Sequence, residues 1–280
     1  MVEKTEKEIQ PYLRQLDYQL HRAKLVLKRG KFSNFDEERI LRSYIDAMLP
    51  PGHSRVAVDL GAGDGVKGSN TYALFSAGWT GLGVECTARK ALRLAATYRP
   101  FDGVTACRSR VTPANAVPLL LEHGIEKEFG VLSLDIDSYD YLVLDELLAH
   151  FRPRIVVTEI NEKIPPPVRF FVKYDPHFTL RHHFYGYSIQ SLADLCAKHD
   201  YAIMSLEYNN AFLAPRELYG AQGQSVESIY REGYVERPDR RKKFPSNHDV
   251  DVLHSLSPAA ALDFIDRFFA KHRGKYELSL

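Results

Sequence analysis

The sequence has little of several features that would place it in a specialised class of proteins. It contains three cysteines, and none of them belongs to a CxxC pair, which argues against a disulfide framework and a zinc–thiolate site. The formal net charge is +1, so no overall field draws the chain toward nucleic acid or a membrane. No apolar run approaches the roughly 18 residues that a membrane span requires. These absences favour a globular protein in a reducing compartment.

Signals for export and for several common enzyme classes are also missing. Residues 1–10 are charged and hold no apolar segment typical of a signal peptide, so we expect a cytoplasmic protein. The sequence contains no G-x-S-x-G, Walker A or H-E-x-x-H motif. The chemistry must therefore be sought in other patterns.

Apolar segments and helical patterns alternate between residues 53 and 216, which we expect to form the main domain. Strands are predicted at residues 56–60, 80–85, 104–107, 130–135 and 154–159. Helices are predicted at residues 67–77, 88–98, 113–123 and 141–150. Pro113 would occupy the first turn of its helix, where proline is tolerated. Strands that are apolar on both faces and separated by helices favour an α/β fold, a mostly parallel sheet with helices on both faces.

The domain is predicted to close with a helix at residues 188–199 and strands at 201–206 and 211–214. Asn209 and Asn210 would form the turn between these strands. Before this helix, residues 162–187 form a long connection with three consecutive prolines and many aromatic residues. Long connections of this kind are usually lids or binding loops, so we expect a lid here.

Extensions flank the main domain on both sides. Residues 1–52 are predicted to be helical, and Ser33 or Asn34 would cap a helix that ends before Pro50. Residues 217–280 form a polar extension that ends in an amphipathic helix at residues 257–271. The terminal helices fit either packing within the chain or contacts in a homo-oligomer.

The most informative stretch is the glycine-rich turn that follows the first strand. It places Gly61, Gly63 and Gly65 at alternate positions, whereas a dinucleotide fingerprint needs its third glycine where Val66 stands. Asp59 precedes the turn, and its carboxylate would repel a pyrophosphate. A ligand with an ammonium group and no phosphates suits this position, and S-adenosylmethionine is such a ligand.

A second acid ends the neighbouring strand. Glu85 lies where this architecture places a carboxylate that accepts hydrogen bonds from ribose hydroxyls. This position fits NAD as well as S-adenosylmethionine. It therefore supports a nucleoside ligand without distinguishing between the two.

These two stretches resemble motifs I and II of class I S-adenosylmethionine-dependent methyltransferases. That family has a seven-stranded Rossmann-like sheet with an antiparallel last strand. The resemblance implies that Asp59 to Gly65, with Gly61, Ala62 and Gly63 between them, hold the methionine part of the donor and that Glu85 holds its ribose. The family often has an aspartate after the third strand for the adenine, and Ser109 is the candidate here. More loosely, residues 33–37 and the Asp-Ile-Asp segment at 135–137 resemble FkbM-type methyltransferases.

Four polar side chains are predicted to meet beside the donor, because the fourth and fifth strands end at the same edge of the sheet. They are Asp135, Asp137, Glu159 and Asn161. Carboxylates this close repel one another unless something neutralises them, and carboxylate and amide oxygens suit Mg²⁺. The alternative is that Asp137 and Asp140 cap the following helix while Asp135 bonds the donor or substrate without a metal.

The long connection also carries histidines that would cover this site. His182 or His183 would serve as a general base or as a further metal ligand, or would pack without a catalytic role. Because they are adjacent, only one of them would face the site if the segment were extended, and we favour His182.

The function that we expect is an S-adenosylmethionine-dependent methyltransferase. Its acceptor would be a hydroxyl on a small polar metabolite, sugar or natural product, with Asp135, Mg²⁺ and a loop histidine assisting deprotonation. A nicotinamide-dependent oxidoreductase is the alternative enzyme, although Val66 and Asp59 speak against it. A catalytically silent scaffold with this fold is the other alternative, and the retained acids speak against that. We expect no contact with nucleic acid or a membrane.

Overall fold

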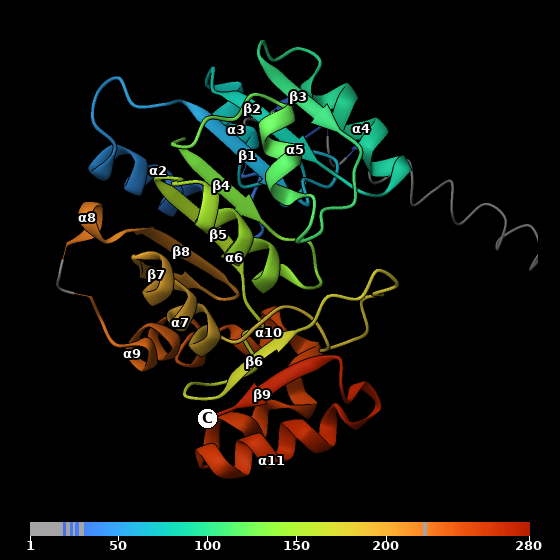
Figure 1. Cartoon of the computed structure of the whole chain (residues 1–280), viewed down its shortest axis with the longest axis vertical. Coiled ribbons are helices and arrows are strands. Elements are labelled where there is room, and N and C mark those ends of the chain that lie inside the picture. The colour runs from blue at the N-terminus through green and yellow to red at the C-terminus, as the bar shows by residue number, and fades with distance from the viewer. Residues whose placement is uncertain (1–18, 21–22, 25, 28–30, 221–222) are drawn as a thin grey trace, which may run out of the picture.

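A computed structural model of the chain describes residues 19–20, 23–24, 26–27, 31–220 and 223–280 (Figure 1). Most of the helical region predicted for residues 1–30 lies outside these described residues. Helix α2 spans Glu37–Met48. The predicted N-cap at Ser33 or Asn34 is wrong, because the helix follows Asp36, although the Ser33 hydroxyl accepts a hydrogen bond from the Glu38 amide in its first turn at 3.2 Å.

The centre of the molecule is a seven-stranded sheet in the order β3-β2-β1-β4-β5-β8-β7 (Figure 1). Its strands are β1 (Val56–Leu60), β2 (Thr80–Val84), β3 (Val104–Cys107), β4 (Val131–Leu134), β5 (Ile155–Glu159), β7 (Tyr201–Glu207) and β8 (Asn210–Pro215). Strands β1 to β5 pair in parallel, whereas β8 is antiparallel to both of its neighbours. The predicted sheet, including its antiparallel last strand, is confirmed.

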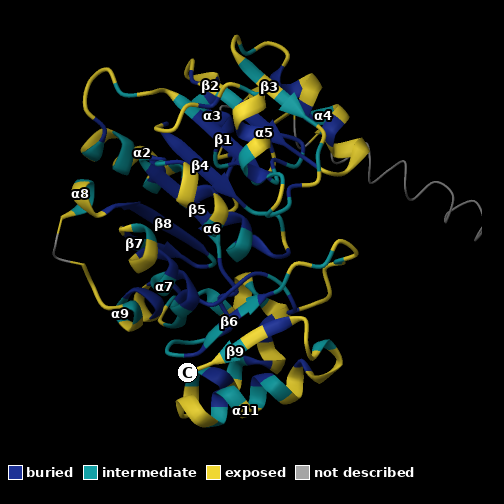
Figure 2. Cartoon of the chain, viewed as in Figure 1, coloured by how far each residue is buried: buried dark blue, intermediate teal, exposed yellow. Residues whose placement is uncertain are grey.

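Helices cover both faces of this sheet, as Figure 2 shows by the buried strands between partly exposed helices. The helices are α3 (Tyr72–Ser76), α4 (Ala88–Tyr98), α5 (Ala116–Glu122), α6 (Asp140–His150) and α7 (Ile189–His199). Successive residues of β4 point to opposite faces. Val131 packs in the core below α3 and α4, and Leu132 packs in the core below α5, α6 and α7.

Helix α3 is shorter than predicted, because side chains before it bond to the backbone and form turns. The Asp64 carboxylate accepts hydrogen bonds from the amides of Val66 and Lys67 at 3.0 Å each. The Ser69 hydroxyl accepts from the amide of Tyr72 at 3.0 Å. Such local bonds compete with helix formation, so the helix predicted at residues 67–77 begins only at Tyr72.

Two further local predictions are wrong. Pro113 precedes the helix instead of entering its first turn, because Thr112 and Asn115 bond to each other's amides and delay the start to Ala116. The turn between β7 and β8 falls one residue earlier than predicted. Tyr208 adopts a left-handed φ of 58°, and Asn210 already belongs to β8.

The predicted lid contains a strand that the sequence pattern did not reveal. Strand β6 (Arg169–Val172) pairs antiparallel with β9 (Tyr276–Ser279), which holds the last residues of the chain against this connection. Together with helix α11 (Pro258–Phe268) these strands enclose a third core, to which Val250 and Leu253 also contribute. We call β6 and residues 245–280 the C-terminal lobe. The amphipathic helix predicted at 257–271 is largely confirmed, with the Ser257 hydroxyl accepting from the Ala260 amide.

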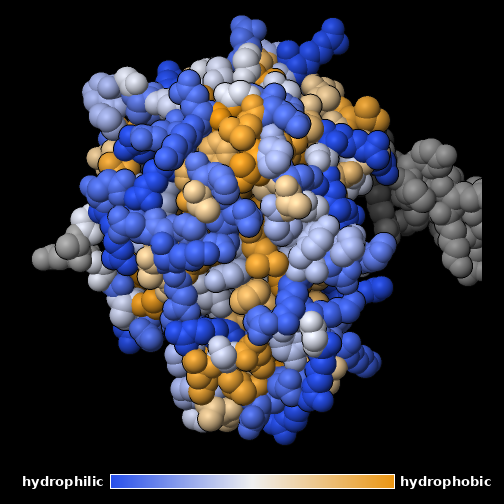
Figure 3. Space-filling model, viewed as in Figure 1, coloured by the Kyte–Doolittle hydropathy of each residue, from blue (hydrophilic) through white to orange (hydrophobic). Residues whose placement is uncertain are grey.

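Short helices make up most of the remaining chain after β8. They are α8 (Arg216–Tyr219), α9 (Val226–Tyr230), η1 (Arg231–Val235), α10 (Arg240–Lys243), η2 (Pro245–Asp249), η3 (Asp251–Ser255) and η4 (Ala270–His272). Figure 3 shows apolar surface over β9 and α11, where Phe268 and Leu280 are exposed. Across the described ranges, no helix has both the length and the apolar character that crossing a membrane requires.

Candidate functional site

The glycine-rich turn lies across the carboxyl end of β2. The amides of Gly61 and Ala62 both donate to the Val84 carbonyl at 3.0 Å. Gly61 has a φ of 96°, and a Cβ at this position would lie 1.7 Å from the Asp135 carbonyl oxygen. Only glycine fits here, because the turn passes directly against the end of β4.

The other two glycines of the turn serve different purposes. A Cβ at Gly65 would lie 2.8 Å from side-chain atoms of Leu94 and of Tyr98, so this glycine lets the turn pack against α4. Gly63 also has a left-handed φ, of 60°, but a Cβ there would meet no described atom within 4 Å. The turn is therefore closely packed at Gly61 and Gly65 and open at Gly63.

Asp59 is buried beside the turn. Its carboxylate accepts a hydrogen bond from the Thr71 hydroxyl at 2.6 Å. Burial raises the pKa of Asp59 to about 6, and hydrogen bonds from Thr71 and Ser133 oppose this shift. The sequence did not predict this hydrogen bond between Asp59 and Thr71, the residue directly before α3. Contact between this carboxylate and a donor's ammonium group stays a prediction.

The residues predicted to hold a nucleoside follow β2 and β3, at the same edge of the sheet. Glu85 is buried, and its carboxylate accepts a hydrogen bond from the Thr87 amide at 2.6 Å. Ser109 is half-buried two residues beyond β3, with its hydroxyl 3.5 Å from the Arg110 carbonyl. Their roles toward ribose and adenine stay predictions.

Three of the four predicted metal ligands converge. The carboxylate groups of Asp135, Asp137 and Glu159 each offer an oxygen, and these oxygens lie within 4.8 Å of one another. We call this group the carboxylate cluster. The Oδ1 atom of Asp135 is buried and has no hydrogen-bond partner among the described residues. A buried carboxylate oxygen without a partner is costly, so this atom indicates a missing cation or donor.

The raised pKa values of the carboxylate cluster also favour a bound proton or cation. Burial raises the pKa of Asp135, and the charges of Asp137 and Asp140 raise it further. Burial and the charge of Asp135 also hold the pKa of Glu159 well above its usual range. The only neighbour that donates to Glu159 in the described structure is Asn209, at 2.5 Å. Asp135 and Glu159 therefore hold protons more tightly than free carboxyl groups do, and a cation bound at the cluster would offset the same repulsion.

Asn161 and Asp140 are tied to the backbone beside the carboxylate cluster. The Asn161 amide group is fully buried and donates to the carbonyls of His183 and Tyr185 at 2.9 Å each. Its Oδ1 atom has no partner in the described part of the chain, so its role as a metal ligand stays a prediction. Asp140 is the first residue of α6 and accepts from the amides of Ile136 and Ser138, which precede the helix, at 2.8 Å each. The N-cap of α6 is Tyr139, whose side chain makes no capping hydrogen bond, so the alternative that Asp137 and Asp140 cap this helix is wrong.

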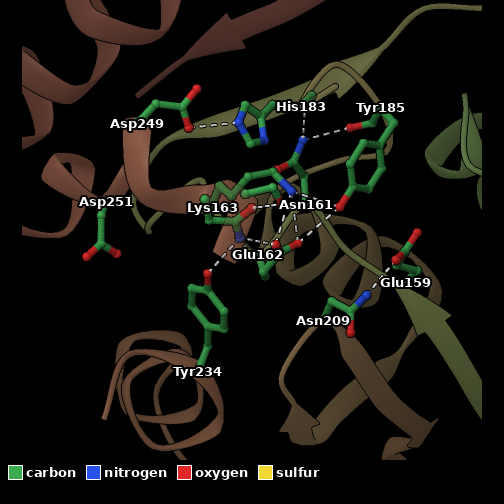
Figure 4. Close-up of polar contacts among 12 residues, drawn as sticks. Glu159, Asn161, Glu162, Lys163, His183, Tyr185, Asn209, Tyr234, Asp249 and Asp251 are labelled. Atoms are coloured by element: carbon green, nitrogen blue, oxygen red, sulfur yellow. Dashed lines mark hydrogen bonds and ion pairs between the residues drawn. The ribbon is translucent and has the colours of Figure 1, made fainter. Parts of the chain in front are cut away.

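A buried polar network that the sequence analysis missed lies next to this cluster (Figure 4). The Lys163 ammonium group lies 3.1 Å from Glu162 and 2.8 Å from the Tyr185 hydroxyl, and both charged residues are almost fully buried. Burial raises the pKa of Asp137, and the charges of Lys90 and, to a smaller extent, Lys163 oppose this shift. The sequence feature that could have revealed this network is the run of consecutive polar residues directly after strand β5.

The two histidines lie away from the carboxylate cluster, with Asp249 of the C-terminal lobe. His183 is buried, and its Nε2 atom lies 3.0 Å from the Asp249 carboxylate. His182 is exposed and has a left-handed φ of 46°. Burial, followed by the charge of Lys163, lowers the pKa of His183. The expectation of an extended segment with the rings on opposite sides is wrong, because the ring centroids are 3.8 Å apart. A role as general base stays a prediction.

The strand order, the single antiparallel strand and the helices on both faces define a class I, Rossmann-like methyltransferase fold. The resemblance seen in the glycine-rich turn and Glu85 is thus confirmed at the level of the fold.

Several solved methyltransferases are similar to this chain at low sequence identity. A S-adenosylmethionine-dependent methyltransferase from Clostridium acetobutylicum is 10% identical, with a TM-score of 0.43, covering 72% of this chain and 98% of its own. TrmK of M. capricolum, solved with S-adenosyl-homocysteine, is 8% identical, with a TM-score of 0.47 and coverages of 85% and 95%. Magnesium protoporphyrin IX methyltransferase from Synechocystis, solved with bound S-adenosylmethionine, is 12% identical, with a TM-score of 0.39 and coverages of 70% and 95%. No family model and no curated protein matches the sequence.

Proposed function

We propose that this protein is a methyltransferase that binds S-adenosylmethionine at the glycine-rich turn. The observation that carries this proposal is the contrast among the three glycines. All three have a positive φ, and packing additionally excludes a side chain at Gly61 and Gly65, whereas a Cβ at Gly63 would meet no described atom within 4 Å. The backbone at Gly63 is therefore open to close approach by a ligand.

The residues around the turn suit the parts of this ligand. Glu85 would accept hydrogen bonds from the ribose hydroxyls, and the carboxyl groups of Asp59 and Asp135, which lie beside the turn, would accept hydrogen bonds from the ammonium group. Ser109 would face the adenine. When bound, S-adenosylmethionine would supply an electrophilic methyl group. The contribution of the chain is to hold the acceptor atom in line with that group and to exclude water.

Thermal unfolding with and without S-adenosylhomocysteine tests the donor. A ligand at one hundred times its Kd stabilises a protein by about 2.7 kcal/mol, so we expect a clear rise in Tm. An unchanged Tm at saturating S-adenosylhomocysteine would count against the proposal. A rise in Tm with NAD instead would favour the oxidoreductase.

We propose further that the acceptor is a hydroxyl on a small polar metabolite, sugar or natural product, and that Mg²⁺ assists the reaction. The carboxylate cluster supplies the hard oxygen ligands that this ion prefers, and Oδ1 of Asp135 lacks a partner in the described structure. Mg²⁺ held there would lower the pKa of a bound hydroxyl. Asp135, Asp137 and Glu159 would hold the ion, with Asn161 as a further oxygen ligand.

Manganese titration followed by electron paramagnetic resonance tests the metal without a known acceptor. Mn²⁺ shares the oxygen ligands of Mg²⁺. We expect about one bound Mn²⁺ per chain that Mg²⁺ displaces, and at least about tenfold weaker binding in Asp137→Asn, as for the loss of metal-supporting groups generally. Asp102→Asn, an exposed acid outside the cluster, should bind as the unchanged protein does. Equal binding by all three proteins would refute the metal site.

A further inference from the structure

A second group of potential ligands lies where the 162–187 connection meets the C-terminal lobe. His182, His183 and Asp249 each offer a ligand atom, and these atoms lie within 4.8 Å of one another. The shortest of these contacts joins His183 Nε2 to Asp249 Oδ1 at 3.0 Å. We propose that these three residues bind a divalent transition-metal ion of the Zn²⁺ type, at a site separate from the carboxylate cluster.

The backbone at His182 supports this proposal. The Phe184 amide donates to the Arg181 carbonyl at 2.8 Å, so the two histidines form the corners of a tight turn. His182 has a left-handed φ of 46° at the first corner, a conformation for which glycine is usual. The consequence is that neighbouring rings, which alternate in an extended strand, gather on one side with Asp249. Such an unfavourable conformation persists at sites where a ligand or function requires it.

The chemistry of the donors selects the class of metal. Two imidazoles and one carboxylate suit Zn²⁺ and similar ions, whereas Mg²⁺ prefers oxygen ligands alone. With bonds of about 2.0–2.1 Å, the ligand atoms of a tetrahedral zinc lie about 3.4 Å apart. The separations in this group need only small side-chain movements to reach that value. His182 is exposed, so a fourth position would be open to water.

The position of the group indicates what the ion would do. Asp249 is the last residue of η2, and the histidines belong to the connection that also carries Tyr185 (Figure 4). The His183 carbonyl accepts from the buried Asn161 side chain, which follows β5. An ion here would join the C-terminal lobe to the connection and fix the segment that bonds to Asn161. We therefore assign it a structural role, independent of the proposed methyl transfer.

Cobalt titration of tag-free, metal-depleted protein tests this site directly. Co²⁺ replaces Zn²⁺ and gives strong visible absorption only at sites of low coordination number. We expect saturation at one Co²⁺ per chain, loss of the absorption on adding Zn²⁺, and a higher Tm with Zn²⁺. The exposed variant His182→Ala and the isosteric variant Asp249→Asn should each weaken Co²⁺ binding at least tenfold and lose the gain in Tm. Neither depends on replacing the buried His183.

Two controls separate this site from other metal-binding groups. His177→Ala removes an exposed histidine of the same connection that lies outside the group, and it should leave the absorption unchanged. Asp137→Asn, which disrupts the carboxylate cluster, should also retain it. No cobalt absorption in the unchanged protein, or absorption that persists in both His182→Ala and Asp249→Asn, would overturn the proposal.

Discussion

Three glycines in one turn are required for different reasons at the level of single residues. At Gly61 the obstacle to a side chain is the backbone carbonyl of Asp135, which cannot rotate away as a side chain can. Gly124 offers a matched comparison, because it has a left-handed φ of 70° and a Cβ there would meet nothing within 4 Å. Both positions have a positive φ, and they differ in packing.

Gly61→Ala is expected to lower the free energy of unfolding by at least about 3 kcal/mol, because the new methyl group must displace the end of β4. Gly124→Ala should cost about 1–2 kcal/mol, the usual penalty for a left-handed residue other than glycine. Urea unfolding followed by circular dichroism measures both. Similar losses of unfolding free energy in the two variants would show that the turn does not pack closely against β4 at Gly61.

The buried Asp59 carboxylate predicts a pH dependence of stability. Its pKa is raised from 3.8 to about 6 in the folded protein, so the folded state holds this proton more tightly than the unfolded state. The resulting stability is complete below pH 3.8 and is lost as the pH rises to about 6. At about 1.36 kcal/mol per pKa unit, the loss is about 3 kcal/mol.

Asp59→Asn should remove this loss, because the amide is neutral throughout and still accepts from Thr71. We expect the variant to gain stability relative to the unchanged protein between pH 4 and pH 6, by up to about 3 kcal/mol. Chemical unfolding across this range measures the difference, and Asp102→Asn controls for the loss of an exposed acid. Parallel pH curves for Asp59→Asn and the unchanged protein would contradict the burial of this charge.

Some of the residues at the two proposed sites could be predicted from the sequence, and others could not. The glycine spacing, Glu85 and the meeting of Asp135 with Glu159 follow from local pattern and from the rule that parallel strands end at one edge. The pairing of His183 with Asp249 was not predictable, because the two residues are 66 positions apart and Asp249 lies in a polar stretch without periodicity. The same applies to Lys163, whose burial depends on Glu162 and Tyr185.

At the level of elements, the C-terminal lobe depends on its own core. Phe170 of β6 is fully buried and lies within 5.6 Å, between ring centroids, of Phe269 and Tyr276. Leu180, in the same connection, is 46% exposed. Comparing substitutions at these two positions distinguishes the loss of core packing in the C-terminal lobe from general effects of changing the 162–187 connection.

Phe170→Ala should therefore destabilise the lobe by about 3–5 kcal/mol, as large-to-small changes in a core do. Leu180→Ala should change stability by less than about 0.5 kcal/mol. Hydrogen exchange of the amides in β6 and β9 measures the effect where it arises. Unchanged protection of β9 in Phe170→Ala would contradict the pairing of these strands.

Helices and strands were predictable where the spacing of apolar residues along the sequence determines them. Helix α4 and strand β3 have the predicted bounds, because both follow clear patterns between turns. Helix α3 starts late because the Asp64 and Ser69 side chains bond to the backbone before it. Strand β6 was not recognisable from local pattern, because it is formed by pairing with β9, which lies far from it in the sequence.

At the level of the whole molecule, the sheet brings the proposed site together. The glycine-rich turn, Glu85 and the carboxylate cluster follow different strands, and the parallel pairing of β1, β2, β4 and β5 brings them to one edge. The C-terminal lobe contacts that edge through Glu162, which follows β5 and accepts a hydrogen bond from the Asn247 side chain of η2 at 2.6 Å. The central claim is that the open side of the turn, at Gly63, is where the donor binds.

Calorimetric titration with S-adenosylhomocysteine tests this claim most directly, in the unchanged protein, Gly63→Ala and Gly124→Ala. The two variants share the same backbone cost, and only the Gly63 variant places a methyl group on the open side of the turn. We predict stoichiometric binding to the unchanged protein and to Gly124→Ala, and binding weakened at least tenfold, about 1.4 kcal/mol, in Gly63→Ala. Equal binding to all three proteins, or binding to none, would contradict the account.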